Sequence, residues 1–459
     1  MSLKNNIIKV FSANILTAIS GVIISFIVPM VLSVEGYAEL KTYTFYVSYI
    51  LIVSLGFVDG INYKYGGKKQ DEIDLELVKF EHRFFLFTQI IFTIIFIILG
   101  IYLQSIMIIM IGISIIPINL SWFYKFYYQA TGEFRKYTNI SYIYTITYFI
   151  SNCILIFLFK SDNYIYYCFT TIISHGLAFA ISEIIFYKKM KIYKVKYSNE
   201  IFFNIKVGIV VLIGNLSTML FYALDRWFIK IFLTTNDFAY YSFSISMMNL
   251  INILVSSLSI TFYNYLARGK SNEDIKKIKI YLIILGAFCS SAYFIFAGII
   301  TIMLKKYIPS LSIIAISFAA YPYIITINAL IVNLYKANKK EKKYVRSVFI
   351  MVIVSLVYNI IAIILAKKSQ SIAIATTLAF ITWYIISMMD FKYLSINIKE
   401  VLFLGIVTIS FLFLSHNIKW FIGIILYLSI VFLSAILIYK NELTEVLKKI
   451  IKYNSYNDN

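Results

Sequence analysis

The sequence predicts an all-α polytopic membrane protein with about fourteen transmembrane helices. Twelve of these form two parallel six-helix repeats, the N- and C-lobes around a central cavity, and two extra helices follow at the C-terminus. Three observations lead to this prediction: a series of apolar segments, an uneven distribution of positive charge, and residues that recur in both halves of the chain. Hydrophobic residues make up 61% of the 459-residue chain, which leaves no room for a large soluble domain.

Apolar segments follow one another along the whole chain. Most of them are close to the roughly 20 residues that an α-helix needs to cross a bilayer. The segments run approximately 10–32, 42–62, 84–103, 106–124, 138–159, 164–186, 207–233, 239–262, 280–304, 311–335, 347–366, 371–389, 401–415 and 420–439. The segment 401–415 is the shortest of them. The longest polar stretch, 63–83, is predicted to be a loop with room for an amphipathic helix.

Positive charge alternates between the gaps that separate these segments. With the N-terminus inside, the cytoplasmic gaps hold 33 of the 42 Lys and Arg residues, and the external gaps hold seven. Because short loops rich in Lys and Arg stay in the cytoplasm, this asymmetry predicts that both termini are cytoplasmic. The same topology accounts for the net charge of +20, so nucleic acid is not an expected partner.

The first six and the second six segments carry matching residues. Asn14 precedes the Tyr37-Ala38 pair by the same separation as Asn215 precedes Phe238-Ala239. A second set of matches follows the fourth and tenth segments, namely Tyr128, Ala130 and Tyr137 against Tyr335, Ala337 and Tyr344. Because six is an even number, both halves begin on the cytoplasmic side, and the repeat is parallel with a substrate site expected between the lobes. Asn14 and Asn215 are therefore candidates for lining a shared cavity.

Two of the four prolines also fall at corresponding places. Pro117 lies in the fourth segment and Pro322 in the tenth, where each is predicted to kink its helix, because proline removes a backbone hydrogen bond. The kinks could serve as hinges or as static packing features. The repeat divides the chain into an N-lobe at 1–196, a C-lobe at 197–398 and the two extra helices with a cytoplasmic tail at 399–459.

The seventh segment contains charges that are costly inside a membrane. Tyr222, Arg226 and Lys230 share one helix face, and Asp225 is available as a partial counter-ion. Two interpretations are open. The cations could bind a phosphate or pyrophosphate, for which the planar guanidinium is well suited, or the segment could end early with both cations reaching the outer headgroups.

Asp59 and Glu183 lie near the ends of their segments, and Asp225 lies within the seventh segment. Asp59 could bind a proton or a cation that drives transport, or it could cap a helix end. Asp225 is the other candidate for such coupling. Glu183 is predicted to form a surface ion pair with Lys188 or Lys189.

The sequence holds no pattern typical of an enzyme or a metal site. The three cysteines and three histidines have no ligand spacing, and no phosphate-binding or hydrolase motif occurs. These residues are Cys153, Cys168, Cys289, His82, His175 and His416. We therefore expect neither catalysis nor a bound metal or other cofactor.

Four stretches carry a resemblance to a known family: GFVDGINYKYGG at 56–67, YYQATGEFRKY at 127–137, LDRWFIK at 224–230 and NDFAYYSFS at 236–244. With the length, span number and repeat layout, they resemble the polysaccharide repeat-unit flippases (Wzx-like O-antigen and capsule flippases). That group is part of the multidrug/oligosaccharidyl-lipid/polysaccharide exporter superfamily.

The resemblance implies a function. A flippase of this kind moves an undecaprenyl-pyrophosphate-linked oligosaccharide from the inner to the outer leaflet of the bacterial cytoplasmic membrane by alternating access. Its expected partners are that lipid-linked sugar, the membrane lipids and, as a further candidate, a polysaccharide polymerase complex. A proton or sodium gradient is a candidate driving force. Arg226 and Lys230 match the family's charged cluster in the seventh span.

Two alternatives belong to the same superfamily. A cation-coupled drug antiporter needs cavity carboxylates, whereas the cluster in the seventh span is net positive. A lipid II flippase carries cavity arginines, including one in the first span, where this chain has Asn14. Both comparisons favour the repeat-unit flippase.

Overall fold

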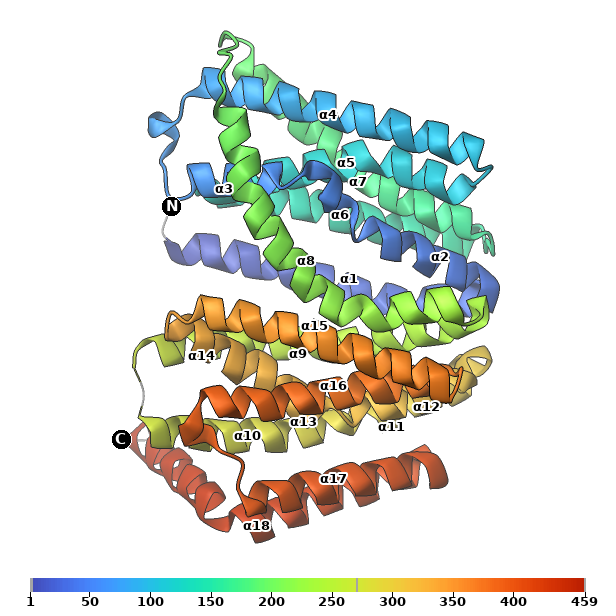
Figure 1. The fold of residues 1–459 in the computed structure, drawn as a ribbon, viewed down its shortest axis with the longest axis vertical. Helices are drawn as coiled ribbons and strands as arrows, with labels where there is room; N and C mark the ends of the chain where they lie inside the picture. The colour runs from blue at the N-terminus through green and yellow to red at the C-terminus, as the bar shows by residue number, and fades with distance from the viewer. Residues whose placement is uncertain (1–2, 270, 458–459) are drawn as a thin grey trace. The chain divides into compact units, whose positions relative to one another are not determined.

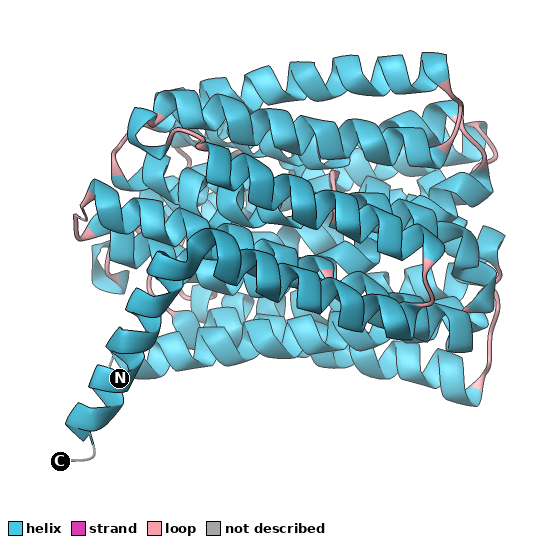
Figure 2. Cartoon of the chain, turned by 90° about the horizontal axis from the view of Figure 1, so that it is seen from below, coloured by secondary structure: helices cyan, strands magenta, loops and turns pink. Residues whose placement is uncertain are grey.

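Helices form all of the secondary structure in the part of the chain that the computed structural model describes, residues 3–269 and 271–457 (Figure 2). Twelve helices there are long and apolar enough to cross a membrane, and two further pairs of bent helices raise the number of spans to as many as fourteen. Each predicted segment coincides with one of these spans. The prediction of an all-α polytopic membrane protein is confirmed, whereas its orientation and the parallel repeat stay predictions.

The chain divides into two compact units, Met1–Thr218 and Met219–Asn459, here called unit 1 and unit 2. The division falls within one long helix, α8. The division at 1–196, 197–398 and 399–459 that the repeat implies stays a prediction. The helices up to this division, labelled in Figure 1, are α1 (Leu3–Val31), α2 (Val34–Val47), α3 (Phe57–Tyr65), α4 (Leu75–Tyr102), α5 (Ile106–Ala130), α6 (Phe134–Cys153), α7 (Tyr164–Met190) and α8 (Glu200–Phe232). Short helical turns lie at η1 (Ile50–Ser54), η2 (Gln70–Glu72) and η3 (Ile154–Leu158).

Unit 2 begins with the end of α8, and its described residues contain ten further α-helices. They are α9 (Thr235–Ala267), α10 (Asn272–Ser290), α11 (Ala292–Met303), α12 (Leu311–Phe318), α13 (Tyr321–Ile325), α14 (Val332–Ala337), α15 (Glu341–Leu365), α16 (Ser369–Asp390), α17 (Ile398–Asn417) and α18 (Trp420–Asn457). Three short turns, η4 (Lys305–Ser310), η5 (Thr326–Ile331) and η6 (Lys392–Leu394), lie between them. The short predicted segment 401–415 is thus a full-length helix, α17.

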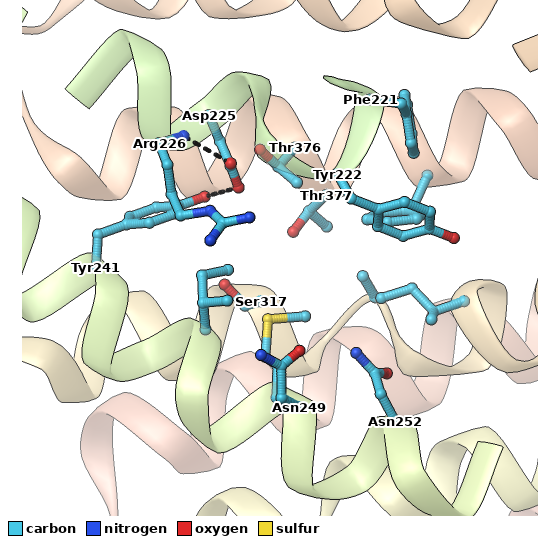
Figure 3. A pocket seen from close by; sticks show the side chains of 15 residues that line it. Phe221, Tyr222, Asp225, Arg226, Tyr241, Asn249, Asn252, Ser317, Thr376 and Thr377 are labelled. Carbon is cyan, nitrogen blue, oxygen red and sulfur yellow. Dashed lines mark hydrogen bonds between the residues drawn. The ribbon is translucent and has the colours of Figure 1, made fainter. Parts of the chain in front are cut away.

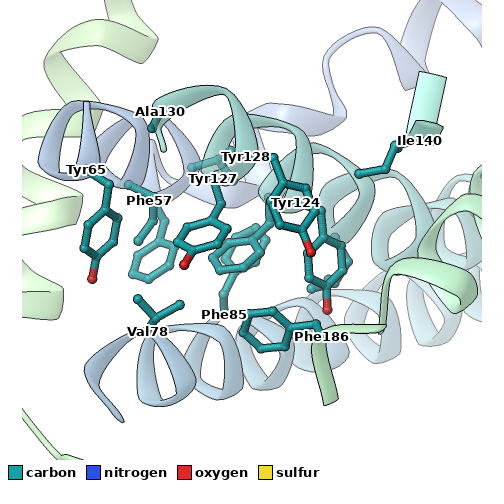
Figure 4. Packing of buried hydrophobic residues seen from close by; sticks show 14 of the residues in the cluster. Phe57, Tyr65, Val78, Phe85, Tyr124, Tyr127, Tyr128, Ala130, Ile140 and Phe186 are labelled. Atoms are coloured by element: carbon teal, nitrogen blue, oxygen red, sulfur yellow. The ribbon is translucent and has the colours of Figure 1, made fainter. Parts of the chain in front are cut away.

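Aromatic side chains fill the core of unit 1 where α3, α4 and α5 meet (Figure 4). Phe57 stacks on Phe85 with 5.2 Å between ring centroids, and Phe85 stacks on Phe123 at 5.7 Å. Tyr127 continues the series at 6.4 Å from Phe123. Stacked rings of this kind bury large apolar surfaces in fixed geometry, so they hold the three helices in register.

The second span is broken rather than straight. The helical stretches Val34–Ser54 and Phe57–Tyr65 meet at an angle of 60°. At the break Leu55 and Gly56 both have left-handed backbone conformations, with φ of 50° and 76°. Glycine adopts such a conformation without steric penalty, so Gly56 permits the turn that a helix alone could not make.

α3 then crosses the first half of α8 at a contact between backbones. A Cβ atom added to Gly60 would lie 2.0 Å from the carbonyl oxygen of Asn204, and one added to Gly208 would lie 1.8 Å from that of Gly56. These distances are far below van der Waals contact. Small residues allow helix backbones in membranes to approach in this way, and here only glycine fits.

One face of α15 shows how the surface suits lipid. Its large apolar side chains are exposed at helical spacing along one side, at Val345, Phe349, Ile353, Leu356, Val357, Ile360, Ile361 and Ile364. The opposite side is buried and includes Ser355 and Asn359. A helix that exposes its most apolar side fits hydrocarbon rather than water.

The tenth span is also broken. The stretches Lys305–Phe318 and Tyr321–Ala337 meet at 51°, and Pro322 opens the second of them. Its ring and missing N–H prevent a regular helix from continuing through the preceding turn. In the fourth span, by contrast, α5 is assigned as one helix through Pro117, whose carbonyl oxygen accepts a hydrogen bond from Ser121 Oγ at 2.6 Å.

We expect Gly286→Ala to destabilise the protein at this bend. A Cβ atom on Gly286 of α10 would lie 2.4 Å from Pro322 Cα, so either helix must move, which costs about 1–3 kcal/mol. Thermal unfolding of the detergent-solubilised protein measures this effect. Gly405→Ala is the matched control, because a Cβ there meets no atom within 4 Å. Equal Tm values for the two variants would show that the contact between α10 and Pro322 is not tight.

Candidate functional site

Each unit contains a cavity lined by polar side chains of its spans. The unit-2 cavity, with a volume of about 270 Å³, lies among α8, α9, α12, α13 and α16 (Figure 3). The residues that line it are Phe221, Tyr222, Asp225, Arg226, Tyr241, Ile245, Met248, Asn249, Asn252, Ser317, Ala320, Ile324, Thr376, Thr377 and Phe380. Three of the residues that the sequence singles out in the seventh span, Tyr222, Asp225 and Arg226, are therefore together at one site.

Asp225 is held by two hydrogen bonds. The backbone N–H of Arg226 donates to Oδ1 at 2.6 Å, and the Tyr241 hydroxyl donates to Oδ2 at 2.7 Å. Only 4% of the Asp225 residue is exposed. A buried carboxylate in a membrane span needs such donors and a nearby cation, since its charge is poorly solvated there. The next residue in the chain, Arg226, supplies the cation.

Arg226 extends its guanidinium into the cavity, with Asn249 and Asn252 of α9 across from it (Figure 3). The hydroxyl of Tyr222, one turn before Arg226, donates a hydrogen bond to Asn328 Oδ1 at 2.9 Å. The cavity thus combines a planar cation, amide groups and aromatic rings. Such groups can bind an oxyanion and the polar edge of a sugar.

The other predicted site residues lie elsewhere. Lys230 does not line the unit-2 cavity, and its ammonium lies 5.1 Å from the centre of the Phe238 ring. Asn215 is exposed on the unit-1 part of α8. Asp59 is in the first turn of α3, where a carboxylate interacts favourably with the helix dipole. Asn14 lines the cavity of unit 1.

The unit-1 cavity has a volume of about 260 Å³ and lies among α1, α5, α6 and α7. Its lining residues are Asn14, Thr17, Ser121, Trp122, Lys125, Ile140, Ser141, Tyr144, His175 and Ala178. By sequence, Lys125 falls in the cytoplasmic gap after the fourth segment, and His175 lies within the sixth segment with no second histidine or cysteine at ligand spacing. The sequence signal for Lys125 is its position one turn after Ser121, on a helix that continues to Ala130.

A buried polar cluster joins α3, α4 and α8 next to the glycine contact. Glu81 is fully buried, and its Oε1 accepts from Lys64 Nζ and from Asn204 Nδ2, both at 2.7 Å. Its Oε2 accepts from the Tyr65 hydroxyl at 2.7 Å. Lys64 also pairs with Glu200, the first residue of α8, at 2.6 Å. The stretch 63–83 is thus largely helical, and only 66–74 separates α3 from α4.

Glu183 has partners other than those expected. It does not pair with the lysines that follow it in sequence. Its Oε2 lies 3.0 Å from His82 Nε2 and accepts from the Tyr124 hydroxyl at 2.5 Å. The prediction of a surface ion pair with Lys188 or Lys189 is wrong, because α7 turns Glu183 toward His82 of α4 and Tyr124 of α5, although its side chain stays partly exposed.

A second buried ion pair fixes α17 to the rest of unit 2. Lys279 Nζ lies 2.6 Å from Glu400 Oε2, and both side chains are almost completely buried. The Tyr384 hydroxyl also donates to Glu400, and Lys279 donates to the carbonyl oxygen of Leu394 at 2.7 Å. These contacts explain why α17 belongs to unit 2, although the proposed repeat does not include it.

The fold is similar to those of solved membrane transporters. A solved structure described as lipid II flippase MurJ in an inward closed conformation matches with a TM-score of 0.68 at 14% identity, over 95% of this chain and 99% of that chain. An inward-facing multidrug resistance MATE family transporter of the MOP superfamily matches with a TM-score of 0.55 at 11% identity, over 83% and 95%. Neither a protein-family model nor a curated protein sequence matches the chain. At these identities the likeness establishes the fold, and the substrate has to be argued from the cavities.

Proposed function

We propose that the protein is a flippase that moves an undecaprenyl-pyrophosphate-linked oligosaccharide from the inner to the outer leaflet of a bacterial cytoplasmic membrane by alternating access. The observation that carries the proposal is Arg226, a cation directed into a polar cavity within an apolar span. The fold shared with a lipid II flippase supports a lipid-linked substrate.

The chemistry of the unit-2 cavity fits such a substrate. The guanidinium of Arg226 can bind two oxygens of a pyrophosphate at once, which an ammonium group cannot do. Asn249 and Asn252 offer amide donors and acceptors for sugar hydroxyls, and Phe380 and Tyr222 offer ring faces. The polyprenyl tail can stay in the lipid while the polar head crosses.

Direction requires a second input. Binding of a proton or a sodium ion at Asp225 or Asp59 would shift the inward–outward equilibrium if the two states differ in affinity for the ion. Asp225 is the stronger candidate, because it lies beside Arg226 in the same cavity and the hydroxyls of Thr376 and Thr377 line that cavity too. Ion and substrate would then act on one group of residues.

A drug antiporter is the second candidate. It is favoured by one observation: Asp225 gives the unit-2 cavity a carboxylate next to its cation, and a cationic drug needs such a group. The fold of a multidrug transporter is also similar. A lipid II flippase is the third, and it is less favoured because the first span has Asn14 where an arginine is expected from the resemblance.

Reconstitution in vesicles separates these candidates. Purified protein is placed in vesicles that contain an undecaprenyl-pyrophosphate-linked oligosaccharide, lipid II, or a fluorescent cationic drug in the lumen. Transfer between leaflets is measured by the access of an added sugar-modifying enzyme, and drug efflux by fluorescence. We expect transfer of the oligosaccharide carrier. Efflux of the drug without lipid transfer would overturn the proposal. Selective transfer of lipid II would show that lipid II, rather than the oligosaccharide carrier, is the substrate.

The proposed orientation makes its own prediction. In a variant without the three native cysteines, a cysteine at Lys340, in a loop counted as cytoplasmic, should react with a membrane-impermeant maleimide only after the cells are permeabilised. A cysteine at Lys160, in a loop counted as external, should react in intact cells. Strong labelling at position 340 in intact cells would invert the topology.

A further inference from the structure

We infer that the unit-1 cavity is a second anion site, in which Lys125 binds an oxyanion of the transported molecule. The inference rests on the proposed function and extends it to a cavity whose lining residues do not include the charged cluster of the seventh span. The oxyanion is either the diphosphate of the lipid carrier or the carboxylate of an acidic sugar.

Lys125 has an unusual environment for a cation. Its ammonium lies 4.7 Å from the centre of the Trp122 ring and 5.1 Å from that of Tyr137. No acidic side chain of the described residues forms a salt bridge with it. Aromatic faces compensate part of the charge, but they leave the N–H donors without an anionic acceptor. A cation held in this way within a span is prepared for an anion from outside the protein.

Other groups of the cavity can complete the site. His175 packs on Tyr144 with 4.3 Å between ring centroids, and its buried Nδ1 has no hydrogen-bond partner within the described part of the chain. The amide of Asn14 lines the same cavity and can donate. An oxyanion accepts several hydrogen bonds at once, so one such group could use all three side chains.

The two cavities differ in charge, and this difference indicates what each can bind. In the unit-2 cavity Arg226 stands beside Asp225, so the two formal charges cancel. In the unit-1 cavity Lys125 is accompanied by no carboxylate among the lining residues. By formal charge, an anion is therefore attracted more strongly to the unit-1 cavity than to the unit-2 cavity. The two cations of the seventh span, counted from the sequence, imply the opposite order.

The size of the unit-1 cavity limits what it holds. At about 260 Å³ it is slightly smaller than the ~300–1,000 Å³ typical of complete sites for small molecules. It can therefore hold one charged group and part of a ring rather than a whole oligosaccharide. Trp122 lines the same cavity, and a sugar next to the anion could stack on its indole ring.

A binding experiment with two probes tests the inference. The purified full-length protein in lipid nanodiscs is titrated with undecaprenyl diphosphate, which has no sugar, and separately with glucuronic acid, which has no phosphate. Lys125→Gln removes the charge, Lys125→Arg keeps it, and Lys188→Gln on the exposed end of α7 is the matched control. We expect Lys125→Gln to weaken binding of one probe about tenfold, as the loss of one charge-assisted hydrogen bond predicts. Lys125→Arg and Lys188→Gln should bind that probe with near wild-type affinity.

The affected probe identifies the source of the oxyanion: undecaprenyl diphosphate indicates the carrier, and glucuronic acid indicates an acidic sugar. If Lys125→Gln unfolds at the wild-type temperature and binds both probes as wild type does, the inference is wrong and the aromatic contacts of Lys125 are structural only. Lipid transfer by the wild-type protein is measured in parallel. Its absence would remove the proposed function, whereas an unchanged rate in Lys125→Gln with normal wild-type transfer would count against the second site alone.

Discussion

Arg226→Ala should lower the rate of lipid transfer by about 100-fold, because a bidentate, charge-assisted contact to a phosphate is lost and such contacts contribute about 1.5–3 kcal/mol. Arg226→Lys should retain part of the activity, since the charge survives and the planar fork does not. The measurement is initial transfer in vesicles with equal amounts of folded protein.

Stability has to be separated from binding in this experiment. Arg226→Ala also leaves Asp225 in its buried position without the adjacent cation, which can destabilise the fold. The double variant Asp225→Asn, Arg226→Ala removes both charges and is the control for this effect. If Arg226 binds the substrate, the double variant should be stable and should bind undecaprenyl diphosphate more weakly than Asp225→Asn alone, which keeps the guanidinium. Full activity of Arg226→Ala, Lys230→Ala at normal expression would show that these cations only reach toward the headgroups.

Glu81→Ala should destabilise unit 1 by about 3–5 kcal/mol, the range measured when one partner of a buried ion pair is removed. Three donors, on Lys64, Tyr65 and Asn204, lose their common acceptor. The Lys64 side chain, which is only 10% exposed, would keep Glu200 as its acidic partner. Unfolding of the solubilised protein by heat or by an increasing fraction of denaturing detergent measures the effect.

Glu35→Ala is a suitable control for Glu81→Ala, because Glu35 is an exposed carboxylate in the first turn of α2. Glu81→Gln is informative as well, since an amide can still accept from Tyr65 while the charge is lost. We expect its stability to lie between those of wild type and Glu81→Ala. Equal unfolding of Glu81→Ala and Glu35→Ala would mean that the cluster does not stabilise the junction of α3, α4 and α8.

The positions of the spans could be predicted from the sequence because a membrane span is a local signal. About 20 apolar residues in succession identify it without reference to any other part of the chain. The segment 401–415 is shorter than this, yet its apolar run also marks a real helix, α17, which extends beyond the segment at both ends. The loop predicted at 63–83 is too long. Lys64, Glu81 and His82 are polar residues typical of a loop, but in the structure they lie in α3 and α4 and form ion pairs or hydrogen bonds there.

The site could be predicted only in part. Asp225 and Arg226 stand out as charges within an apolar segment, and the structure brings them to one cavity. Lys125 lies at the end of a segment, where a lysine usually belongs to the interface, and only the length of α5 places it beside a cavity. The contact between Glu183 and His82 depends on the packing of α4 against α7, which cannot be predicted from the sequence near either residue.

The contact of Gly56 and Gly60 with α8 has a consequence for motion. Where two helices meet through interdigitated side chains, one can turn against the other when those side chains change rotamers. α3 and the first half of α8 meet through bare backbone at Gly60, Asn204 and Gly208. This contact has no room for a side chain, so turning α3 would bring a larger residue against α8. We therefore expect α3 and this half of α8 to move as one body, and the hydrogen bonds around Glu81 hold the two helices together as well.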